Sequence, residues 1–439
     1  VLQVAPEDCT GCNLCVEVCP AKDRQNPEIK AINMMSRLEH VEEEKVNYDY
    51  FLNLPEIDRS KLERIDIRTS QLISPLFEYS GACSGCGETP YIKLLTQLYG
   101  DRMLIANATG CSSIYGGNLP STPYTTDANG RGPAWANSLF EDNAEFGLGF
   151  RLTVDQHRQR VMRLLSEFAD QLPAELNAAL HAEATPEARR EQVAALRQAL
   201  TGVQGAEELL TDADALVEKS VWLIGGDGWA YDIGFGGLDH VLSLTENVNI
   251  LVLDTQCYSN TGGQASKATP LGAVTKFGEH GKRKARKDLG VSMMMYGHVY
   301  VAQISLGAQL NQTVKAIQEA EAYPGPSLII AYSPCEEHGY DLALSHDQMR
   351  QLTATGFWPL YRFDPRRAEE GKIPLALDSR PPSDALAETL LNEQRFRRLN
   401  AQQPEVAEQL WKDAAADLQK RYDFLAQLAG KAEKSPSES

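Results

Sequence analysis

Several features are missing from this sequence of 439 residues, and each absence excludes a class of protein. No apolar run approaches the ~20 residues that a membrane-spanning helix needs, and no basic segment followed by a hydrophobic one stands at the start. We therefore expect no membrane or secreted protein and place the chain in the cytoplasm. Positive charge is scarce: 42 Lys and Arg face 60 Asp and Glu, and the resulting net charge of −18 disfavours nucleic acid as a partner.

A disulfide framework is not expected either, although the chain holds nine cysteines. Four of them form one run, Cys9, Cys12, Cys15 and Cys19, which ends at Pro20. This CxxCxxCxxxCP spacing is typical of bacterial ferredoxins, whose closely spaced thiolates hold [4Fe-4S] clusters. A zinc site or a group of inert buried cysteines would not require this spacing.

A second copy of this cysteine run is absent. In two-cluster ferredoxins the fourth cysteine ligates the other cluster, so we expect Cys9, Cys12 and Cys15 to share a cluster and Cys19 to serve its neighbour. The alternative is a single cluster bound by all four cysteines. The sequence also begins with Val1 instead of methionine. We therefore expect the chain to be a piece of a longer polypeptide whose N-terminal part is missing.

Four further cysteines stand apart from this run: Cys83 and Cys86 form a CxxC pair, and Cys111 and Cys335 lie farther along the chain. A lone CxxC pair occurs in zinc sites, in thioredoxin-like redox pairs and in iron–sulfur sites, so the spacing by itself leaves these alternatives open. Cys257 is left over, and its type suits an ordinary buried position.

Short apolar segments alternate with helical patterns between residues 100 and 340. Strands are predicted at 103–106, 221–224, 248–253, 299–304 and 327–331, with helices near 232–244 and 310–322. This alternation predicts an α/β fold with a parallel sheet. Segments rich in Ala, Leu and Glu at 161–180 and 188–200 predict two or three inserted helices.

Two strand ends carry residues suited to a diphosphate and a divalent cation. They are Gly226, Asp227, Gly228 and Trp229 after the first strand, and Thr255, Cys257, Asn260 and Thr261 after the next. Glycine lets the backbone approach phosphate groups at a helix start. Because Asp227 would repel a diphosphate, its natural role is to hold Mg²⁺ between protein and diphosphate oxygens. The pattern resembles the thiamine diphosphate motif, which opens with GDG and closes near an Asn.

Taken together, the motifs resemble those of the pyruvate:ferredoxin (flavodoxin) oxidoreductases over about residues 1 to 340. The motifs, in order, are the cysteine run, YSGACSGCGET (79–89), NATGCSS (107–113), GDGWAYDIG (226–234), YSNTGGQ (258–264) and YSPC (332–335). The resemblance implies a 2-oxoacid oxidoreductase that decarboxylates pyruvate with coenzyme A to acetyl-CoA and CO2. Electrons would pass through [4Fe-4S] clusters to ferredoxin or flavodoxin. It also implies a homodimer.

The same resemblance assigns roles to single residues. Cys83, Cys86, Cys111 and Cys335 would ligate the cluster nearest thiamine diphosphate. Asp227, Thr255 and the backbone carbonyl of Cys257 would hold Mg²⁺. Asn260 would lie beside the reacting carbon as a catalytic residue, and Glu88 would contact the cofactor. The carboxylate that activates the aminopyrimidine and the groups that bind the pyruvate carboxylate come from an N-terminal domain in this family, so we expect this chain to be inactive alone.

These assignments predict four regions. Residues 1–37 form a partial bacterial-ferredoxin-like 2[4Fe-4S] segment, and residues 38–77 form a connector. Residues 78–385 form a parallel-sheet thiamine diphosphate-binding α/β domain with its own [4Fe-4S] cluster, which contains a helical insertion at about 153–219. Residues 386–439 form a helical C-terminal extension. Two alternatives stay open. One is an electron-transfer protein that has lost catalysis, and the other is a non-redox thiamine decarboxylase or carboligase with zinc at the CxxC pair.

Two charged segments allow opposing interpretations. Lys276 and the basic run Lys282–Lys287 could dock an acidic electron carrier or neutralise coenzyme A phosphates, or they could be a solvated loop. Glu336, Glu337 and His338 follow Cys335. They could act as acid–base groups, although surface or supporting positions fit them better.

Overall fold

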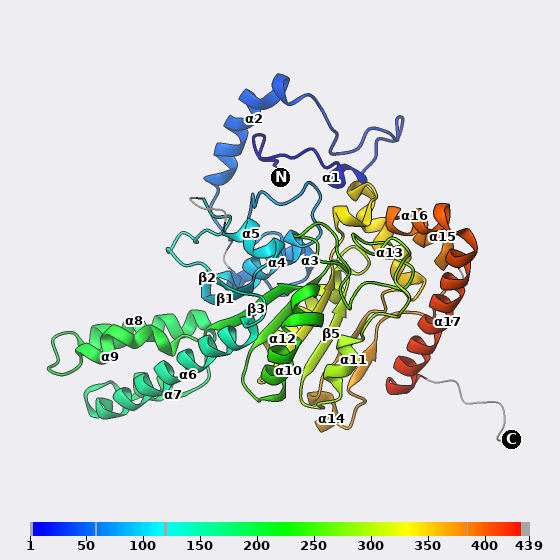
Figure 1. The fold of residues 1–439 in the computed structure, drawn as a ribbon. Coiled ribbons are helices and arrows are strands. Elements are labelled where there is room, and N and C mark those ends of the chain that lie inside the picture. The colour runs from blue at the N-terminus through cyan, green and yellow to red at the C-terminus, as the bar shows by residue number, and fades with distance from the viewer. Residues whose placement is uncertain (1–2, 58, 118–120, 384, 432–439) are drawn as a thin grey trace.

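The computed structural model describes residues 3–57, 59–117, 121–383 and 385–431, and the predicted C-terminal extension lies outside it from residue 432 onward. Figure 1 shows an α/β body with the N-terminal segment above it in the view. The strands are β1 (Met103–Ala108), β2 (Ala134–Ser138), β3 (Ser220–Gly226), β4 (Asn249–Asp254), β5 (Tyr300–Ile304), β6 (Ser327–Tyr332), β7 (Tyr361–Phe363) and β8 (Leu375–Leu377).

The α-helices connect and flank these strands (Figure 1). They are α1 (Leu14–Glu17), α2 (Arg37–Leu52), α3 (Ile67–Ser70), α4 (Thr89–Tyr99), α5 (Cys111–Gly116), α6 (Asn143–Glu167), α7 (Ala174–His181), α8 (Pro186–Leu200), α9 (Glu207–Asp212), α10 (Phe235–Ser243), α11 (Leu289–Met294), α12 (Leu310–Glu321), α13 (Ser345–Ala354), α14 (Arg366–Glu369), α15 (Leu386–Leu390), α16 (Gln394–Gln402) and α17 (Pro404–Leu428).

The eight strands form one sheet in the order β2-β1-β3-β4-β6-β5-β7-β8. The strands from β2 to β5 in this order pair in parallel, as predicted, whereas β7 and β8 add an antiparallel edge. The central strands β3, β4 and β6 are buried almost throughout, which explains their continuous apolar sequences. The α/β class predicted from the alternation of strands and helices is confirmed.

Side chains from one strand alternate between two hydrophobic cores, one on each face of the sheet. Leu223 and Val252 point into the core that α10, α11 and α17 cover. Trp222 and Leu251 point to the opposite face, where α4 and α12 pack. Because both faces are covered, the carboxyl ends of the parallel strands remain as the open edge that can hold a site.

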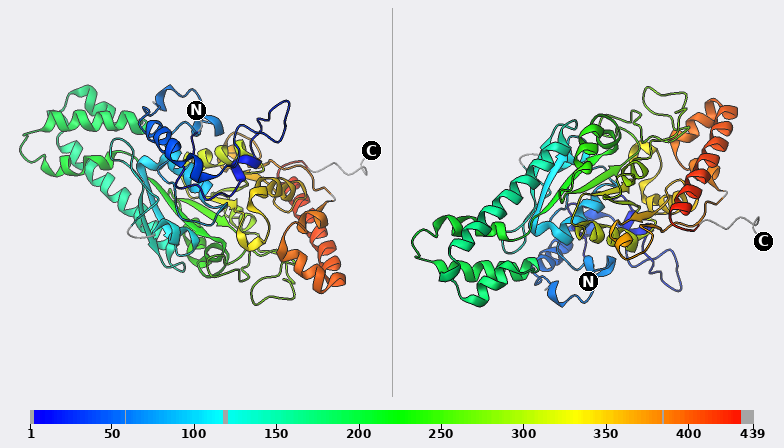
Figure 2. Two further views of the ribbon diagram at one scale, coloured as in Figure 1. Left: turned by 90° about the horizontal axis from the view of Figure 1, so that it is seen from above. Right: turned by 90° about the horizontal axis from the view of Figure 1, so that it is seen from below.

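The predicted helical insertion is an arm of four helices, α6 to α9, which projects from the body in both views of Figure 2. The arm has its own small core around Val161, Leu196 and Leu209. It begins earlier than predicted, because α6 starts at Asn143 and packs on β1 and β3 before it leaves the sheet. The segment 161–180 holds the end of α6 and most of α7, whose N-cap is Pro173.

The N-terminal segment differs from the α/β body. Among the described residues 3–57, only Ala5 is buried. The region predicted as a connector contains α2, a 16-residue helix that has no buried residue and exposes Leu38, Val46 and Tyr50. Within the described part of the chain, no helix is both long and apolar enough to span a membrane.

Candidate active site

Four neighbouring strands end at the same edge of the sheet, and a predicted site residue follows each of them. Cys111 follows β1, Asp227 follows β3, Thr255 follows β4, and Cys335 follows β6. Parallel strands place their carboxyl ends together, so residues far apart in the sequence meet here. The topology brings the predicted magnesium ligands and two of the predicted cluster cysteines to one place.

The three predicted magnesium ligands lie close together, with the hydroxyl of Thr255 between the other two. Its Oγ1 is 3.0 Å from Oδ1 of Asp227 and 3.0 Å from the backbone carbonyl oxygen of Cys257. One hydroxyl proton cannot serve both acceptors at once, whereas a cation among the three oxygens would satisfy all of them. A carboxylate, a hydroxyl and a carbonyl form the hard oxygen set that Mg²⁺ prefers. The residues therefore fit the predicted ion.

Burial makes the Asp227 carboxylate costly without a positive partner. Its side chain is 1% exposed, and burial, with the nearby charge of Asp254, raises its pKa to about 8. Ser266 donates a hydrogen bond to Asp227 Oδ2 and thereby holds the second oxygen in place. A divalent cation would supply the missing positive charge.

A cavity of about 120 Å³ opens beside these oxygens, and all the predicted cofactor residues except Thr255 line it. A π-helical turn, Gly228–Ile233, starts directly after Asp227. A side chain at Gly228 would collide with the ring of Tyr258, so glycine is required there. Trp229 is buried, and its indole N–H has no partner. Asn260 and Thr261 are exposed at the cavity mouth.

A second cavity, of about 170 Å³, is lined by all four cysteines predicted for the cluster: Cys83, Cys86, Cys111 and Cys335. The backbone brings their loops together, because the Gly87 amide donates to the Pro334 carbonyl at 3.0 Å. A Cβ at Gly87 would lie 2.4 Å from the Pro334 nitrogen, so only glycine permits this approach. Burial raises the pKa of the thiols of Cys86 (to about 12), Cys111 and Cys83.

The two cavities share a wall. Glu88, Cys111, Ser259 and Asn260 line both of them. Glu88 is buried, which raises its pKa to about 7, and the Tyr115 hydroxyl donates to it at 2.9 Å. A group bound among the cysteines would therefore lie directly beside one bound at the cofactor residues.

The cysteines surround a space instead of converging on a point. In residues 3–57, 59–117, 121–383 and 385–431, no three His, Cys, Asp or Glu side chains lie close enough together to hold a single metal ion. A cluster of four irons spans a volume, and its ligands need not approach one another as those of zinc do.

The first cysteine run lies on the surface at α1. Cys9 and Cys15 are exposed, and Cys12 and Cys19 are half-buried. Burial, with the nearby charges of Cys12 and Cys9, raises the pKa of the Cys15 thiol. Backbone hydrogen bonds, that of Ala21 first, lower the pKa of the Cys19 thiol. Which cluster Cys19 serves stays a prediction.

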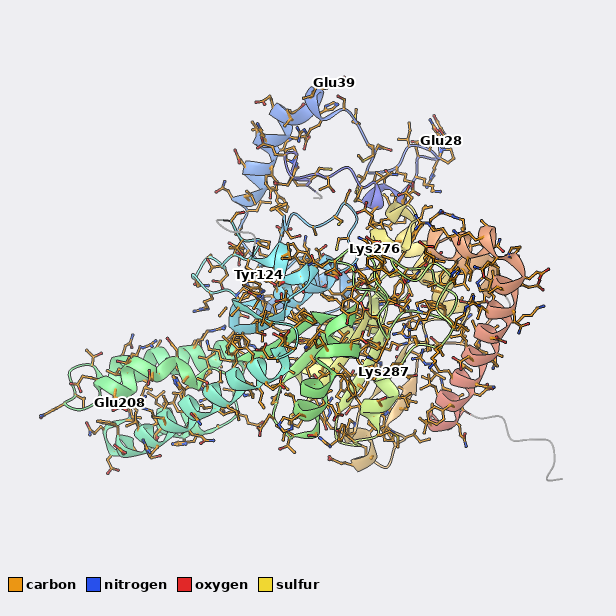
Figure 3. All side chains as sticks on the ribbon, viewed as in Figure 1. Glu28, Glu39, Tyr124, Glu208, Lys276 and Lys287 are labelled. Carbon is orange, nitrogen blue, oxygen red and sulfur yellow. The ribbon has the colours of Figure 1, made fainter. Side chains whose placement is uncertain are left out.

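The charged segments have structural roles. The Lys282 ammonium donates to three backbone carbonyls, those of Ser266, Lys267 and Thr269, and Arg286 pairs with Asp254 at 2.7 Å. Figure 3 shows Lys276 and Lys287 well apart, so the basic residues form no single patch. The buried His338 donates from Nε2 to the Thr255 carbonyl at 2.7 Å, whereas Glu336 and Glu337 are exposed.

Three supporting residues were missed by the sequence argument. Ser266 holds Asp227, Tyr115 holds Glu88, and Ser259 lies 3.3 Å from the Cys111 sulfur. Ser259 belongs to the YSNTGGQ segment, so its place beside a motif residue was the one available signal. Ser266 and Tyr115 are common residue types outside any motif core, and only the fold brings them to the site.

Comparison with known proteins agrees with this geometry. Residues 176–331 match the family described as "Thiamine pyrophosphate enzyme, C-terminal TPP binding domain". Residues 2–22 match the "4Fe-4S binding domain". The first match includes β3, β4 and β6 with the magnesium residues, and the second includes the whole cysteine run. The predictions of thiamine diphosphate and of an iron–sulfur cluster are confirmed at the level of these domains.

Curated relatives match the chain over nearly its whole length. A "Probable pyruvate-flavodoxin oxidoreductase" of Escherichia coli (strain K12) is 93% identical over 99% of this chain. The "Pyruvate-flavodoxin oxidoreductase" of Rhodospirillum rubrum is 55% identical over 99%, and the "Pyruvate:ferredoxin oxidoreductase" of Moorella thermoacetica is 47% identical over 98%. The chain spans 37% of the length of each of these relatives. By these identities and its two matched domains, the chain is homologous to part of the pyruvate-flavodoxin and pyruvate:ferredoxin oxidoreductases.

Proposed function

We propose that this chain is the C-terminal portion of a pyruvate:flavodoxin or pyruvate:ferredoxin oxidoreductase. The enzyme would convert pyruvate and coenzyme A to acetyl-CoA and CO2 and would pass the electrons to flavodoxin or ferredoxin. The observation that carries the proposal is the wall that the cysteine cavity shares with the cofactor cavity. A redox cluster in contact with a thiamine site suits an oxidative decarboxylation, and a simple decarboxylase has no use for it.

The chain's own residues would bind and orient the cofactor. Asp227, Thr255 and the Cys257 carbonyl would hold Mg²⁺ against the diphosphate, and Gly226 and Gly228 would let the backbone approach it. Glu88 and Asn260 border both cavities, so they are placed to contact the cofactor and the reacting substrate. Thiamine diphosphate supplies, when bound, a carbon nucleophile and an electron sink for decarboxylation.

The cysteine groups would form a relay to the surface. Thr10 lies within hydrogen-bonding distance of Ser84, 3.3 Å between hydroxyls, so the first cysteine run lies against the loop of Cys83 and Cys86. A side-chain carbon at Gly85 would lie 3.7 Å from Cβ of Cys12. Clusters of the [4Fe-4S] type pass one electron at a time, so a two-electron oxidation needs such a chain of carriers.

The remaining parts of the site belong to the rest of the polypeptide. We propose that its N-terminal part supplies the carboxylate for the aminopyrimidine, the groups that bind the pyruvate carboxylate, and the cysteines that complete the two ferredoxin-type clusters. The working enzyme would be a homodimer in the cytoplasm. The fragment of 439 residues would therefore bind cofactor and clusters without turning over pyruvate.

The direct test uses the full-length protein that contains this chain, purified without oxygen. We expect it to reduce flavodoxin, ferredoxin or a viologen dye only when pyruvate, coenzyme A, thiamine diphosphate and Mg²⁺ are all present. Release of CO2 without reduction of any acceptor would favour the non-redox decarboxylase. Reversible cluster reduction without binding of thiamine diphosphate would favour an electron carrier that has lost catalysis.

A further inference from the structure

The loop that follows β4 carries two side chains that lie against predicted cluster ligands. The first is Ser259, whose Oγ is 3.3 Å from the Sγ of Cys111. Ser259 also lines the cysteine cavity. This contact reaches from the loop that holds the cofactor residues to a sulfur that would carry iron.

The second side chain is that of Cys257, and the register of the sheet places it. Asp254 in β4 lies opposite Tyr332 in β6, and the same offset three residues later sets Cys257 opposite Cys335. The Ser333 amide donates to the Asp254 carbonyl at 3.0 Å, so the two segments stay side by side beyond the strand ends. Cys257 is buried, and its thiol lies next to that of Cys335.

A bound iron–sulfur cluster would determine which atom donates the proton in each of the two contacts. A cysteine sulfur that ligates iron has no proton, so Cys111 and Cys335 can only accept hydrogen bonds. The Ser259 hydroxyl and the Cys257 thiol must then be the donors. A donor aimed at a cluster sulfur stabilises the reduced, more negative cluster and raises its reduction potential.

We propose that Cys257 and Ser259 are positioning residues that raise the reduction potential of the cluster held by Cys83, Cys86, Cys111 and Cys335. This inference rests on the proposed function. The same loop supplies the Cys257 carbonyl to the predicted magnesium site and places Asn260 in the lining of both cavities. One short segment would thus hold the cofactor and set the driving force for electron transfer away from it.

The test is an anaerobic redox titration of the full-length protein, followed by electron paramagnetic resonance and run without pyruvate. Ser259→Ala and Cys257→Val remove the donors and keep the backbone carbonyls. We expect each to lower the reduced-to-oxidised ratio of one cluster by roughly threefold at fixed potential. Ser259→Thr and Cys257→Ser keep a donor and should restore the ratio. Ser243→Ala, on the exposed side of α10, should leave every component unchanged.

The clusters of the ferredoxin-like segment serve as an internal reference, because among the described residues no hydrogen bond joins Cys257 or Ser259 to the first cysteine run. Unshifted titrations in Ser259→Ala and Cys257→Val, at wild-type iron content, would overturn the inference. Loss of cluster iron from both variants would also overturn it, because the side chains would then hold the ligands in place without tuning the potential. A wild-type protein that lacks the third cluster would instead contradict the proposed function.

Discussion

The two cysteine groups of this molecule sit in opposite surroundings. Cys9, Cys12, Cys15 and Cys19 belong to a segment with a single buried residue, Ala5. The other group lines a cavity at the edge of an eight-stranded sheet with apolar cores on both faces. A segment without a core depends on its metal to fold, whereas a sheet can hold its ligands in place before the metal arrives. A cluster in the first region would therefore order its segment as well as carry electrons, whereas the second region would fold without its cluster.

Removal of iron gives the largest contrast between the two regions. We expect anaerobic chelation of the full-length protein to abolish hydrogen-exchange protection over residues 3–35, because little else orders this segment. The strands β3, β4 and β6 should keep their protection. Hydrogen exchange with mass spectrometry measures both regions in one sample. Retained protection over 3–35 in the iron-free protein would show that the segment folds without its clusters.

Truncation of apolar side chains should separate the regions next. Leu223 is fully buried in β3, and Leu223→Ala should lower the free energy of unfolding by about 2–5 kcal/mol. The matched variant Ile29→Ala removes a side chain that is 51% exposed in the N-terminal segment. It should change the free energy of unfolding by no more than ~0.5 kcal/mol. Chemical denaturation of the iron-loaded protein gives both values. Equal losses would contradict the division into a region with a core and a region without one.

A substitution at the predicted magnesium site should weaken cofactor binding without affecting either cysteine group. Asp227→Asn keeps the size of the side chain and removes its charge, and we expect binding of thiamine diphosphate with Mg²⁺ to weaken at least ~100-fold. Iron content should not change. Asp239→Asn is the control, since Asp239 accepts a hydrogen bond from the Tyr296 hydroxyl and lines neither cavity. Calorimetric titration reports the affinity, and unchanged binding in Asp227→Asn would remove this residue from the magnesium site.

The smallest effect concerns Lys282. Burial lowers its pKa from 10.5 to about 8, so between these values the unfolded chain binds more protons than the folded chain. The free energy of unfolding therefore rises with pH across this window. Lys282→Met should reduce that rise by less than ~1 kcal/mol because of solvent screening, and the remainder comes from Lys287, whose pKa burial also lowers to about 8. Lys284→Met, at an exposed position, should keep it. Chemical denaturation at pH 8 and pH 10 measures the rise in the free energy of unfolding. A rise in Lys282→Met equal to that of the wild type would contradict this prediction.

The fold was predictable where its sequence pattern is strong. The buried strands β1, β3, β4, β5 and β6 are short apolar runs, and all of them were predicted. The edge strand β2 was missed because its residues are exposed or half-buried and lack an apolar run. The strands β7 and β8 have three residues each, too few for a pattern. The helix α2 was missed because its apolar residues do not gather on one face.

The site was predictable as far as its motifs reach. The GDG motif carries Asp227, and the segment after β4 carries Thr255 and Cys257. The fold brings the oxygens of these three residues together. The shared wall of the two cavities was not predictable, because it depends on the order of strands in the sheet. The inward course of the basic run was not predictable for a related reason: Lys282 and Arg286 turn onto backbone carbonyls and Asp254, and a sequence does not reveal such a turn.

The central claim is that Cys83, Cys86, Cys111 and Cys335 hold a cluster beside the cofactor site. Its most direct test is the iron and acid-labile sulfide content of the full-length protein with Cys111→Ser, compared with wild type. We predict a loss of about four irons and four sulfides per chain, with the ferredoxin-type clusters retained. Unchanged iron and sulfide, or zinc in the wild-type protein at this place, would contradict the account.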